Sequence, residues 1–237
     1  ERKINKAMSS NVDIMTMIQW NFLENDNYFQ CKHCRLFKNN KGIKYINRSH
    51  EILTDEGFQI GETDIILYHT GYTFETEEQK QAKAKRNIDL HLMQLRDEPN
   101  NQDVRYNLTR AYGNFQDWKC IIEYGTVALF FDGLDNDKKA QLSYMLFLAW
   151  NNLGRGITAM FYLNLSLQLV PNQRRARLAY SQCLFQEGEF EKSKLELEKM
   201  KGITSGITAD LEYTDEFIDN VLISKIDAIM EEQSNAI

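Results

Sequence analysis

The residues that most constrain the fold recur in the C-terminal half of the chain at a constant spacing. The matched pairs are Gly154 and Gly188, Ala159 and Ser193, and Leu163 and Leu197. This spacing is the length of a repeated helix-turn-helix unit of about 34 residues. In such a unit the glycine permits the turn, the small residue lets the second helix approach the first, and the large residue fills the space between units. The pattern predicts stacked helical hairpins, because one hairpin alone leaves its apolar face in water.

The segment from Ala140 to Pro171 fits the tetratricopeptide pattern, with Trp150 in the aromatic position of its first helix. A second copy begins at Arg174, and an earlier, more divergent copy begins near Gln102. We therefore expect an all-α repeat domain of at least three hairpins.

The repeats are expected to occupy residues 101–201, and residues 202–237 are expected to cap the stack through an amphipathic helix. The acidic segment "DGLDNDKK" at residues 132–139 separates the first copy from the second. Its Asp-x-Asp phrase, Asp135–Asp137, matches a metal-binding signature, but it lies in a polar loop instead of at the end of a buried strand. We interpret its acids as helix caps and solvated surface and reject a metal site there.

The N-terminal half has a different period. Two long strands are expected at Val12–Leu23 and Tyr28–Asn39, and two shorter ones in "IKYIN" and "DIILYH". The opening "ERKINKAM" and the segment Glu77–Leu95 read as helices. We expect residues 1–75 to form an α/β or α+β domain and residues 76–100 to form a connecting helix.

The composition excludes several classes of protein. Apolar residues make up 43% of the chain and charged residues 26%, which is typical of an ordered globular protein. The net charge of −6 argues against a general nucleic-acid binder. No apolar run is long enough to span a membrane. Four cysteines do not suggest a disulfide framework, so we expect a cytoplasmic protein.

The phrase Cys31-Lys32-His33-Cys34 resembles a metal knuckle or a redox pair. In a strand, however, Cys31 and Cys34 point to opposite faces, and no second pair follows to complete four zinc ligands. We interpret them as ordinary strand cysteines.

Two histidines follow the ends of the two short strands. His50 and Glu51 come after one strand, and His69 ends the next, two residues before Gly71. Such residues at strand ends are typical of a site on the rim of a sheet. Glutamate can accept a proton from an attacking hydroxyl or thiol, and histidine can bind a metal ion or a phosphate oxygen. The alternative is that each histidine is a structural hydrogen-bonding residue.

Three phrases in order resemble the C-terminal part of bacterial family-2 glycosyltransferases with tetratricopeptide tails, including the S-glycosyltransferases of antimicrobial peptides. They are "CRLFKNNKGIKYINRSHEIL", "DIILYHTGY" and "KAKRNIDLHLMQLRDEPNNQDVRYNLTRAY". In that family an Arg-Leu/Ile-Phe-Arg/Lys-Asn strand precedes a Tyr-containing strand and a His-Glu pair. A His-x-Gly-Tyr strand end, a helix with Arg-Asn, a proline and the repeats then follow. The match runs from about Lys32 to Tyr112.

The resemblance implies a GT-A fold, a nucleotide-diphosphate sugar donor, Mg²⁺ or Mn²⁺ as cofactor, and a peptide, protein or glycan acceptor. By position, Glu51 matches the catalytic base and His50 lies beside it. His69 matches the histidine that helps to hold the metal and the diphosphate.

The same resemblance assigns Arg35 and Lys38 to the acceptor or the diphosphate. Tyr72 is grouped with these substrate-binding residues and, with Arg86, is expected to fix the junction of sheet and helix. The residues before Glu75 contain neither the base-binding units of the family nor its strand-terminal Asp-x-Asp. We therefore expect the acceptor-side portion of a glycosyltransferase, which is inactive by itself.

The alternative function is a non-catalytic protein-interaction module, in which the repeats bind a peptide and the strands only cap the stack. In the enzyme, the repeats would dock the acceptor or form a homodimer. An exposed repeat face with Phe130, Phe131, Phe147 and Phe161 would suit self-association.

Overall fold

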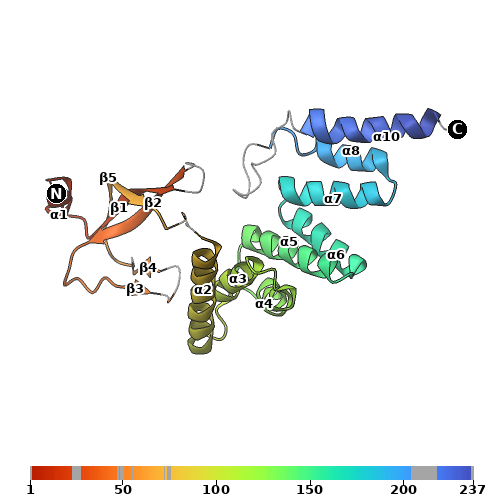
Figure 1. Ribbon diagram of the computed structural model, residues 1–237. Coiled ribbons are helices and arrows are strands. Elements are labelled where there is room, and N and C mark those ends of the chain that lie inside the picture. The colour runs from red at the N-terminus through yellow and green to blue at the C-terminus, as the bar shows by residue number, and fades with distance from the viewer. Residues whose placement is uncertain are drawn as a thin grey trace. The chain divides into compact units, whose positions relative to one another are not determined.

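The computed structural model describes residues 2–22, 28–46, 48, 51–54, 56–71, 73, 76–203 and 218–235. The chain divides into two compact units, Glu1–Pro99 and Asn100–Ile237 (Figure 1). We call them the strand unit and the repeat unit and describe each by itself.

The strand unit holds a mixed three-stranded sheet in the order β2-β1-β5. Its elements are α1 (Arg2–Met8), β1 (Ile14–Phe22), β2 (Tyr28–Phe37), β3 (Tyr45–Ile46), β4 (Ile52–Leu53), β5 (Ile60–His69) and α2 (Glu77–Asp97). Strand β1 runs antiparallel to β2 and parallel to β5, and the short strands β3 and β4 form a separate antiparallel pair. The helix and strand types expected for these segments are confirmed. The larger GT-A sheet is absent from the described residues.

The pairing of β1 with β2 contains a bulge at Arg35. Thr16 lies opposite Cys34 and Met15 lies opposite Leu36, so Arg35 is the extra residue on β2. A bulge bends its strand and changes the direction of the side chain that it carries. The sheet therefore positions Arg35 by a local irregularity that alternation alone does not predict.

The two faces of the three-stranded sheet differ in polarity. On one face Gln19 and Asn21 are buried, at 5% and 1% exposure. Gln19 Nε2 donates to Asn21 Oδ1 at 2.6 Å, and Asn21 Nδ2 donates to the sulfur of Cys31 at 3.0 Å. Because buried polar groups are costly without partners, these bonds make that face a satisfied polar layer.

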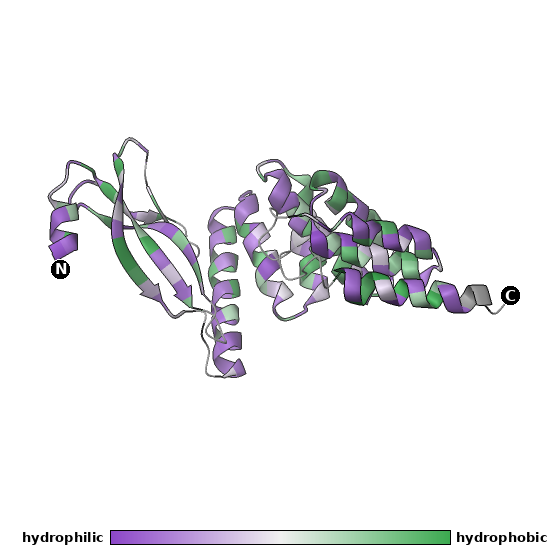
Figure 2. Cartoon of the chain, turned by 90° about the horizontal axis from the view of Figure 1, so that it is seen from above, coloured by the Kyte–Doolittle hydropathy of each residue, from purple (hydrophilic) through white to green (hydrophobic). Residues whose placement is uncertain are grey.

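The other face carries an aromatic cluster. Trp20 stacks on Tyr28 with ring centroids 4.9 Å apart, and Tyr68 meets the ring of Trp20 edge-on at 6.2 Å. Tyr28 and Tyr68 nevertheless remain 52% and 65% exposed. The green bands on the strands in Figure 2 are other, more hydrophobic residues of the sheet, because tryptophan and tyrosine are not green on this hydropathy scale.

Helix α2 begins where Thr76 accepts a hydrogen bond from the backbone of Gln79. It ends at Asp97, two residues beyond the expected end. The segment between β3 and β4 is attached to this helix. The Arg48 guanidinium lies 2.6 Å from the Asp97 carboxylate, and the Arg48 N–H donates to Gln94 Oε1 at 3.1 Å.

The repeat unit consists of helical hairpins, as the spacing predicts. Its elements are α3 (Gln102–Gly113), α4 (Trp118–Phe130), α5 (Asn136–Asn152), α6 (Gly156–Leu169), α7 (Arg174–Gln186), α8 (Phe190–Glu198), η3 (Ile218–Ile223) and α10 (Ser224–Asn235). Helices α3 and α4, α5 and α6, and α7 and α8 pair as hairpins, and each hairpin packs on the next (Figure 1).

Equivalent positions in the second and third hairpins perform the same tasks. Gly154 and Gly188 adopt φ angles of +70° and +80°, the left-handed conformation that favours glycine. Ala159 and Ser193 are 1% and 0% exposed, as expected for residues at the close approach of two helices. The Ser193 hydroxyl donates to the Ser181 carbonyl at 2.9 Å. This buried hydroxyl therefore has a hydrogen-bond partner at the position that Ala159 occupies in the second hairpin.

A second pair of equivalent positions joins the ends of each hairpin. In the second hairpin the Ser166 hydroxyl donates to the Ala140 carbonyl at 2.8 Å. In the third, Arg174 Nε donates to the Met200 carbonyl at 3.2 Å. Different side chains thus close the same gap one repeat apart, which supports the repeat assignment independently of the apolar pattern.

The C-terminal elements pack on the last hairpin. One buried cluster contains Ile218, Ile223 and Ile226 together with Leu197 and Met200 of the third hairpin. Residues 204–217 lie outside the described residues.

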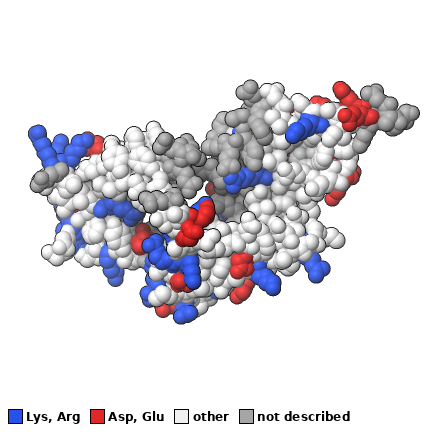
Figure 3. Space-filling model, viewed as in Figure 1, with Lys and Arg blue, Asp and Glu red and all other residues white. Residues whose placement is uncertain are grey.

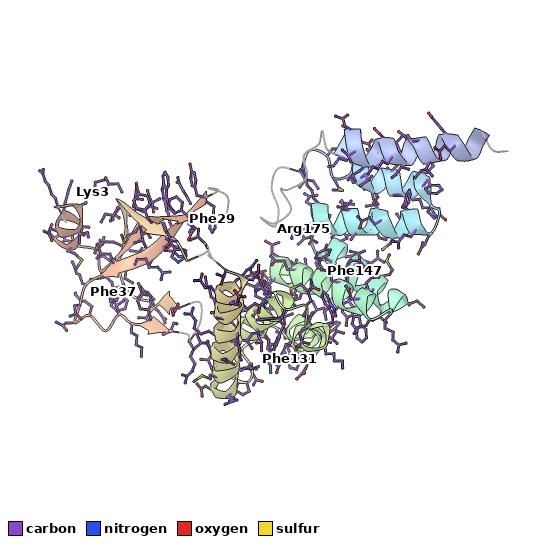
Figure 4. The ribbon with its side chains drawn as sticks, viewed as in Figure 1. Lys3, Phe29, Phe37, Phe131, Phe147 and Arg175 are labelled. Atoms are coloured by element: carbon purple, nitrogen blue, oxygen red, sulfur yellow. The ribbon has the colours of Figure 1, made fainter. Side chains whose placement is uncertain are left out.

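Two details differ from the sequence analysis. Helix α5 begins at Asn136, inside the segment taken as an insertion, and Asp135 caps it by accepting a hydrogen bond from the Lys138 N–H at 2.8 Å. Phe147 was expected on an exposed face, but it is 4% exposed and lies within the packed helices (Figure 4). The helical period places it on the core side of α5.

No helix in the described ranges has the length and apolar character needed to cross a bilayer.

Candidate functional site

The end of β5 forms a compact corner around His69. A Cβ atom on Gly71 would lie 2.7 Å from both Cε1 and Nε2 of His69, so the imidazole folds back over the glycine. The Lys83 ammonium of α2 donates to the Gly71 carbonyl. The His-Thr-Gly phrase thus has a steric explanation, because only glycine leaves room for the ring in this position.

The register of the sheet brings His33 to the same face. His33 lies opposite Met17 on β1, and His69 lies beside Asn21, an even number of residues further along. Side chains that share this parity share a face of the sheet. His33 and Arg35 lie on β2 at the levels of Met17 and of the bulge, which are four or more residues of strand, roughly 13 Å, from the level of His69.

Burial is the first cause of three lowered pKa values at this corner, and neighbouring positive charge adds to it. Loss of water contact, and then the charges of Arg35 and His69, lower the pKa of His33 below its ordinary value. Loss of water contact, and then the charges of Lys83 and Arg35, lower the pKa of His69. Burial, and then Arg86, lower the pKa of Lys83. We call His33, Arg35, His69 and Lys83 the basic corner.

The other predicted site residues are placed as follows. Lys38 follows β2, where its ammonium donates to the Ser10 carbonyl at 2.6 Å. This is the amino end of β1, whereas His69 adjoins Asn21 near its carboxyl end. About seven residues of strand, roughly 23 Å, separate these two levels. The structure therefore does not bring Lys38 to His69.

Glu51 is exposed and immediately precedes β4, so it belongs to the β3–β4 pair and not to the sheet that carries His69. His50 and Tyr72 lie outside the described residues. The expectation of a rim shared by Glu51 and His69 thus stays a prediction, and the two residues come from separate sheets.

The metal-binding role expected of His69 stays a prediction. No group of three or more histidine, cysteine, aspartate or glutamate side chains within the described ranges is arranged to hold one. Divalent Mg²⁺ and Mn²⁺ require oxygen ligands, usually carboxylates, and the charged side chains identified around His69 are cationic. Neither Cys31 nor Cys34 is in a disulfide with another described cysteine, and they lie opposite Gln19 and Thr16, residues of opposite parity on β1.

The repeat unit presents a second candidate surface on its first helices. Gln141, Tyr144, Leu148 and Asn151 form one stripe of α5 that is only partly covered. On α3 the Tyr106 hydroxyl donates to Gln141 Oε1 at 2.6 Å, and the Arg110 guanidinium lies 5.5 Å from the centre of the Tyr106 ring. Tyr106 is itself buried, at 6% exposure, so we give the name α3–α5 surface to Arg110, Gln141, Tyr144, Leu148 and Asn151. It combines aromatic, amide and arginine side chains, which are the types enriched at protein interfaces.

Other apolar side chains of the repeat unit are also exposed. Phe130 and Phe131 are 62% and 56% exposed at the end of α4, and Figure 4 shows Phe131 at this end. On α6, Ile157 is 93% and Phe161 57% exposed.

Sequence reasoning missed two residues of the basic corner and the contact of the corner with Gly71. His33 was considered only with the cysteines beside it, Lys83 was not singled out within the helix expected at Glu77–Leu95, and Gly71 was noted only as a rim glycine. The available signal for His33 was the alternation of side chains along β2, which places His33 and Lys32 on opposite faces of the sheet. Nothing in the sequence signals the bond from Lys83 to Gly71. In the view of Figure 3 the charged side chains of the strand unit are mostly blue.

Comparison with known proteins gives a fold but no family. No family model matches the chain, and no curated protein matches it. Among solved structures, PilF of Pseudomonas aeruginosa is 16% identical, with 67% of this chain and 68% of that chain covered and a TM-score of 0.51.

YrrB, described as a TPR protein with an unusual peptide-binding site, is 19% identical over 51% of this chain and 60% of its own, with a TM-score of 0.43. MamA is 18% identical over 69% of this chain and 99% of its own, with a TM-score of 0.45. The hairpin stack and the likeness to PilF together show that the chain carries a tetratricopeptide-type helical repeat. These likenesses give no indication of a GT-A domain.

Proposed function

We propose that the repeat unit is a protein-interaction module that binds a peptide or protein segment on its α3–α5 surface. The observation that carries the proposal is the regular hairpin stack, in which the first helices keep a partly covered stripe of Tyr144, Leu148 and Asn151. Stacks of this kind present extended surfaces to which peptides bind. Tyrosine and arginine are the residues most enriched among those that dominate binding energy.

The test is selection of peptides from a random library on the full chain, followed by hydrogen exchange of the chain with the selected peptide. The proposal predicts slower exchange in α3 and α5 and unchanged exchange in α4 and α6. Protection confined to α6 or to the strand unit would contradict it.

A second function is proposed for the strand unit, as the acceptor-side portion of a sugar transferase that uses a nucleotide-diphosphate donor. The observation that favours it is the pair of His69 and Lys83 beside Gly71 at the end of β5, because imidazole and ammonium groups suit a diphosphate. Glu51 is the proposed base, with His50 beside it, and the acceptor is a peptide, protein or glycan docked by the repeats. The two functions are compatible, because each belongs to a different unit.

Sugar transfer is tested in the complete protein that contains this chain. Glu51→Gln should abolish turnover and leave the affinity for the nucleotide sugar unchanged, because it removes only a proton acceptor. Glu56→Gln, a matched change at another exposed carboxylate of the same segment, should have no effect. Full turnover by Glu51→Gln would remove the base assignment.

Self-association is a further part of the proposal. Phe130, Phe131 and Phe161 are exposed and suit contact with a second copy, whereas the buried Phe147 takes no part. Light scattering should show a dimer that Phe161→Glu weakens, and a monomer at all concentrations would exclude it.

A further inference from the structure

We infer that the α3–α5 surface selects acidic peptides, because Arg110 receives an aspartate or glutamate side chain of the bound segment. The inference rests on the proposed function of the repeat unit and adds the chemistry of the ligand to it. Of the five residues of this surface, only Arg110 carries a formal charge, and that charge is positive.

Two hydrogen bonds between α3 and α5 fix the direction and the level of these helices. Lys138 Nζ donates to Asp103 Oδ1 at 2.7 Å, and the Tyr106 hydroxyl donates to Gln141 Oε1 at 2.6 Å. Each bond joins residues that are 35 positions apart in the sequence. Equal separations mean that α3 and α5 run in the same direction with corresponding residues level. The ion pair with Lys138 also neutralises Asp103, which is the acidic residue of α3.

Arg110 therefore lies beside the partly covered stripe of α5. It follows Tyr106 by four residues, so the two side chains share one face of α3. The separation of 35 residues places Arg110 level with residue 145, between Tyr144 and Leu148 of the stripe. Aromatic and aliphatic neighbours exclude water when a ligand covers them, and they strengthen a salt bridge formed between them.

The guanidinium of Arg110 is held in place but not neutralised. It lies 5.5 Å from the centre of the buried Tyr106 ring, and the bond to Gln141 fixes that tyrosine. Among the residues that the structure describes, Arg110 forms no ion pair with a carboxylate. A guanidinium that stacks on an aromatic ring can bind a carboxylate through two parallel N–H bonds at its edge. Charge complementarity thus favours an acidic peptide over a neutral or basic one.

The experiment measures the affinity of the full chain for a library-selected peptide that slows hydrogen exchange in α3 and α5. The peptide is made with an amidated C-terminus and as the free acid, so that a side-chain carboxylate is distinguished from the terminal one. Each aspartate and glutamate is then replaced in turn by asparagine or glutamine. One replacement should weaken binding to the wild type by about tenfold and leave binding to Arg110→Gln unchanged, because the pair is already broken there.

Charge reversal tests the same pair in the opposite direction. Arg110→Glu should weaken the selected peptide by more than about tenfold, and a lysine in place of the identified acid should restore the affinity for this variant. Thermal unfolding verifies that the variants fold. The replacements in the peptide test the inference on the wild type alone.

Arg105→Gln is the matched control. It removes the same charge from α3 at about 140° around the helix from Arg110, where Arg105 Nη1 donates to Gln102 Oε1 at 3.4 Å. This variant should bind the selected peptide with unchanged affinity.

Three results would overturn the inference: selected peptides that protect α3 and α5 without containing an acidic residue, equal losses on acid replacement in wild type and Arg110→Gln, or binding that requires the free C-terminal carboxylate. Each of them would leave the interaction module standing. Protection confined to α6 or to the strand unit would instead remove the proposed function, and the inference with it.

Discussion

At the scale of single residues, Gly71 determines where His69 lies. Gly71→Ala would place a methyl group within 2.7 Å of the present position of the imidazole, so the ring must turn away. We expect the NMR signals of His69 to shift strongly, and its pKa to return toward the ordinary value as it leaves Lys83. The signals of His91, elsewhere on α2, should stay in place. An unchanged His69 signal would mean that the ring does not occupy this position.

The lowered pKa values of His33 and His69 make the stability of the strand unit depend on pH. In the unfolded chain both imidazoles titrate near 6.5, whereas in the folded chain they bind protons only at lower pH. The unfolded state therefore binds more protons below about pH 6.5, and the free energy of unfolding falls as the pH drops through that value. The effect should be small, because both side chains contact water.

Arg35→Gln removes one cause of these shifts. The NMR titration midpoints of His33 and His69 should rise toward 6.5 in this variant, and Lys32→Gln should change neither. Midpoints at or above 6.5 in the wild type would contradict the placement of Arg35 and Lys83 beside these rings.

At the scale of the helical hairpin, two glycines close together in sequence should behave oppositely. Gly154→Ala forces a left-handed φ of +70° on a residue with a side chain, which costs about 1–2 kcal/mol. Gly156, at the start of α6, has no atom near its missing Cβ and no such φ angle. Gly156→Ala should leave stability unchanged or raise it by a few tenths of a kcal/mol. Urea unfolding of both variants measures the difference, and equal effects would refute the turn assignment.

Leu163 and Phe161 provide a second matched pair on α6. Leu163 is fully buried, so Leu163→Ala should lower the free energy of unfolding by about 2–5 kcal/mol. Phe161 is 57% exposed, and Phe161→Ala should cost less than about 1 kcal/mol. A larger loss for Phe161 than for Leu163 would mean that the core side of the helix has been assigned to the wrong face.

At the scale of the whole molecule, the sequence predicts the repeat unit better than the strand unit. The repeat is local: spacing identifies the turn at Gly154, the close approach at Ala159 and the core position of Leu163. Phe147 was misplaced although the helical period, which puts it on the same side of α5 as Ala140 and Ser143, indicates a core position.

The basic corner depends on contacts distant in sequence. The bulge at Arg35 arises from the pairing of β1 with β2, and the bond from Lys83 to Gly71 joins a helix to a turn twelve residues earlier. Neither has a local signature. Alternation does predict the opposite faces of Cys31 and Cys34, since it needs only one strand.

The account rests most heavily on the α3–α5 surface as the place where a peptide binds. Its most direct test is the affinity of the full chain for a library-selected peptide, measured for the wild type, for Arg110→Ala and Tyr144→Ala on that surface, and for Phe161→Ala on α6. The account predicts a loss of at least about tenfold for the first two variants and no change for the third. Undiminished affinity in both Arg110→Ala and Tyr144→Ala, with a loss in Phe161→Ala, would contradict it.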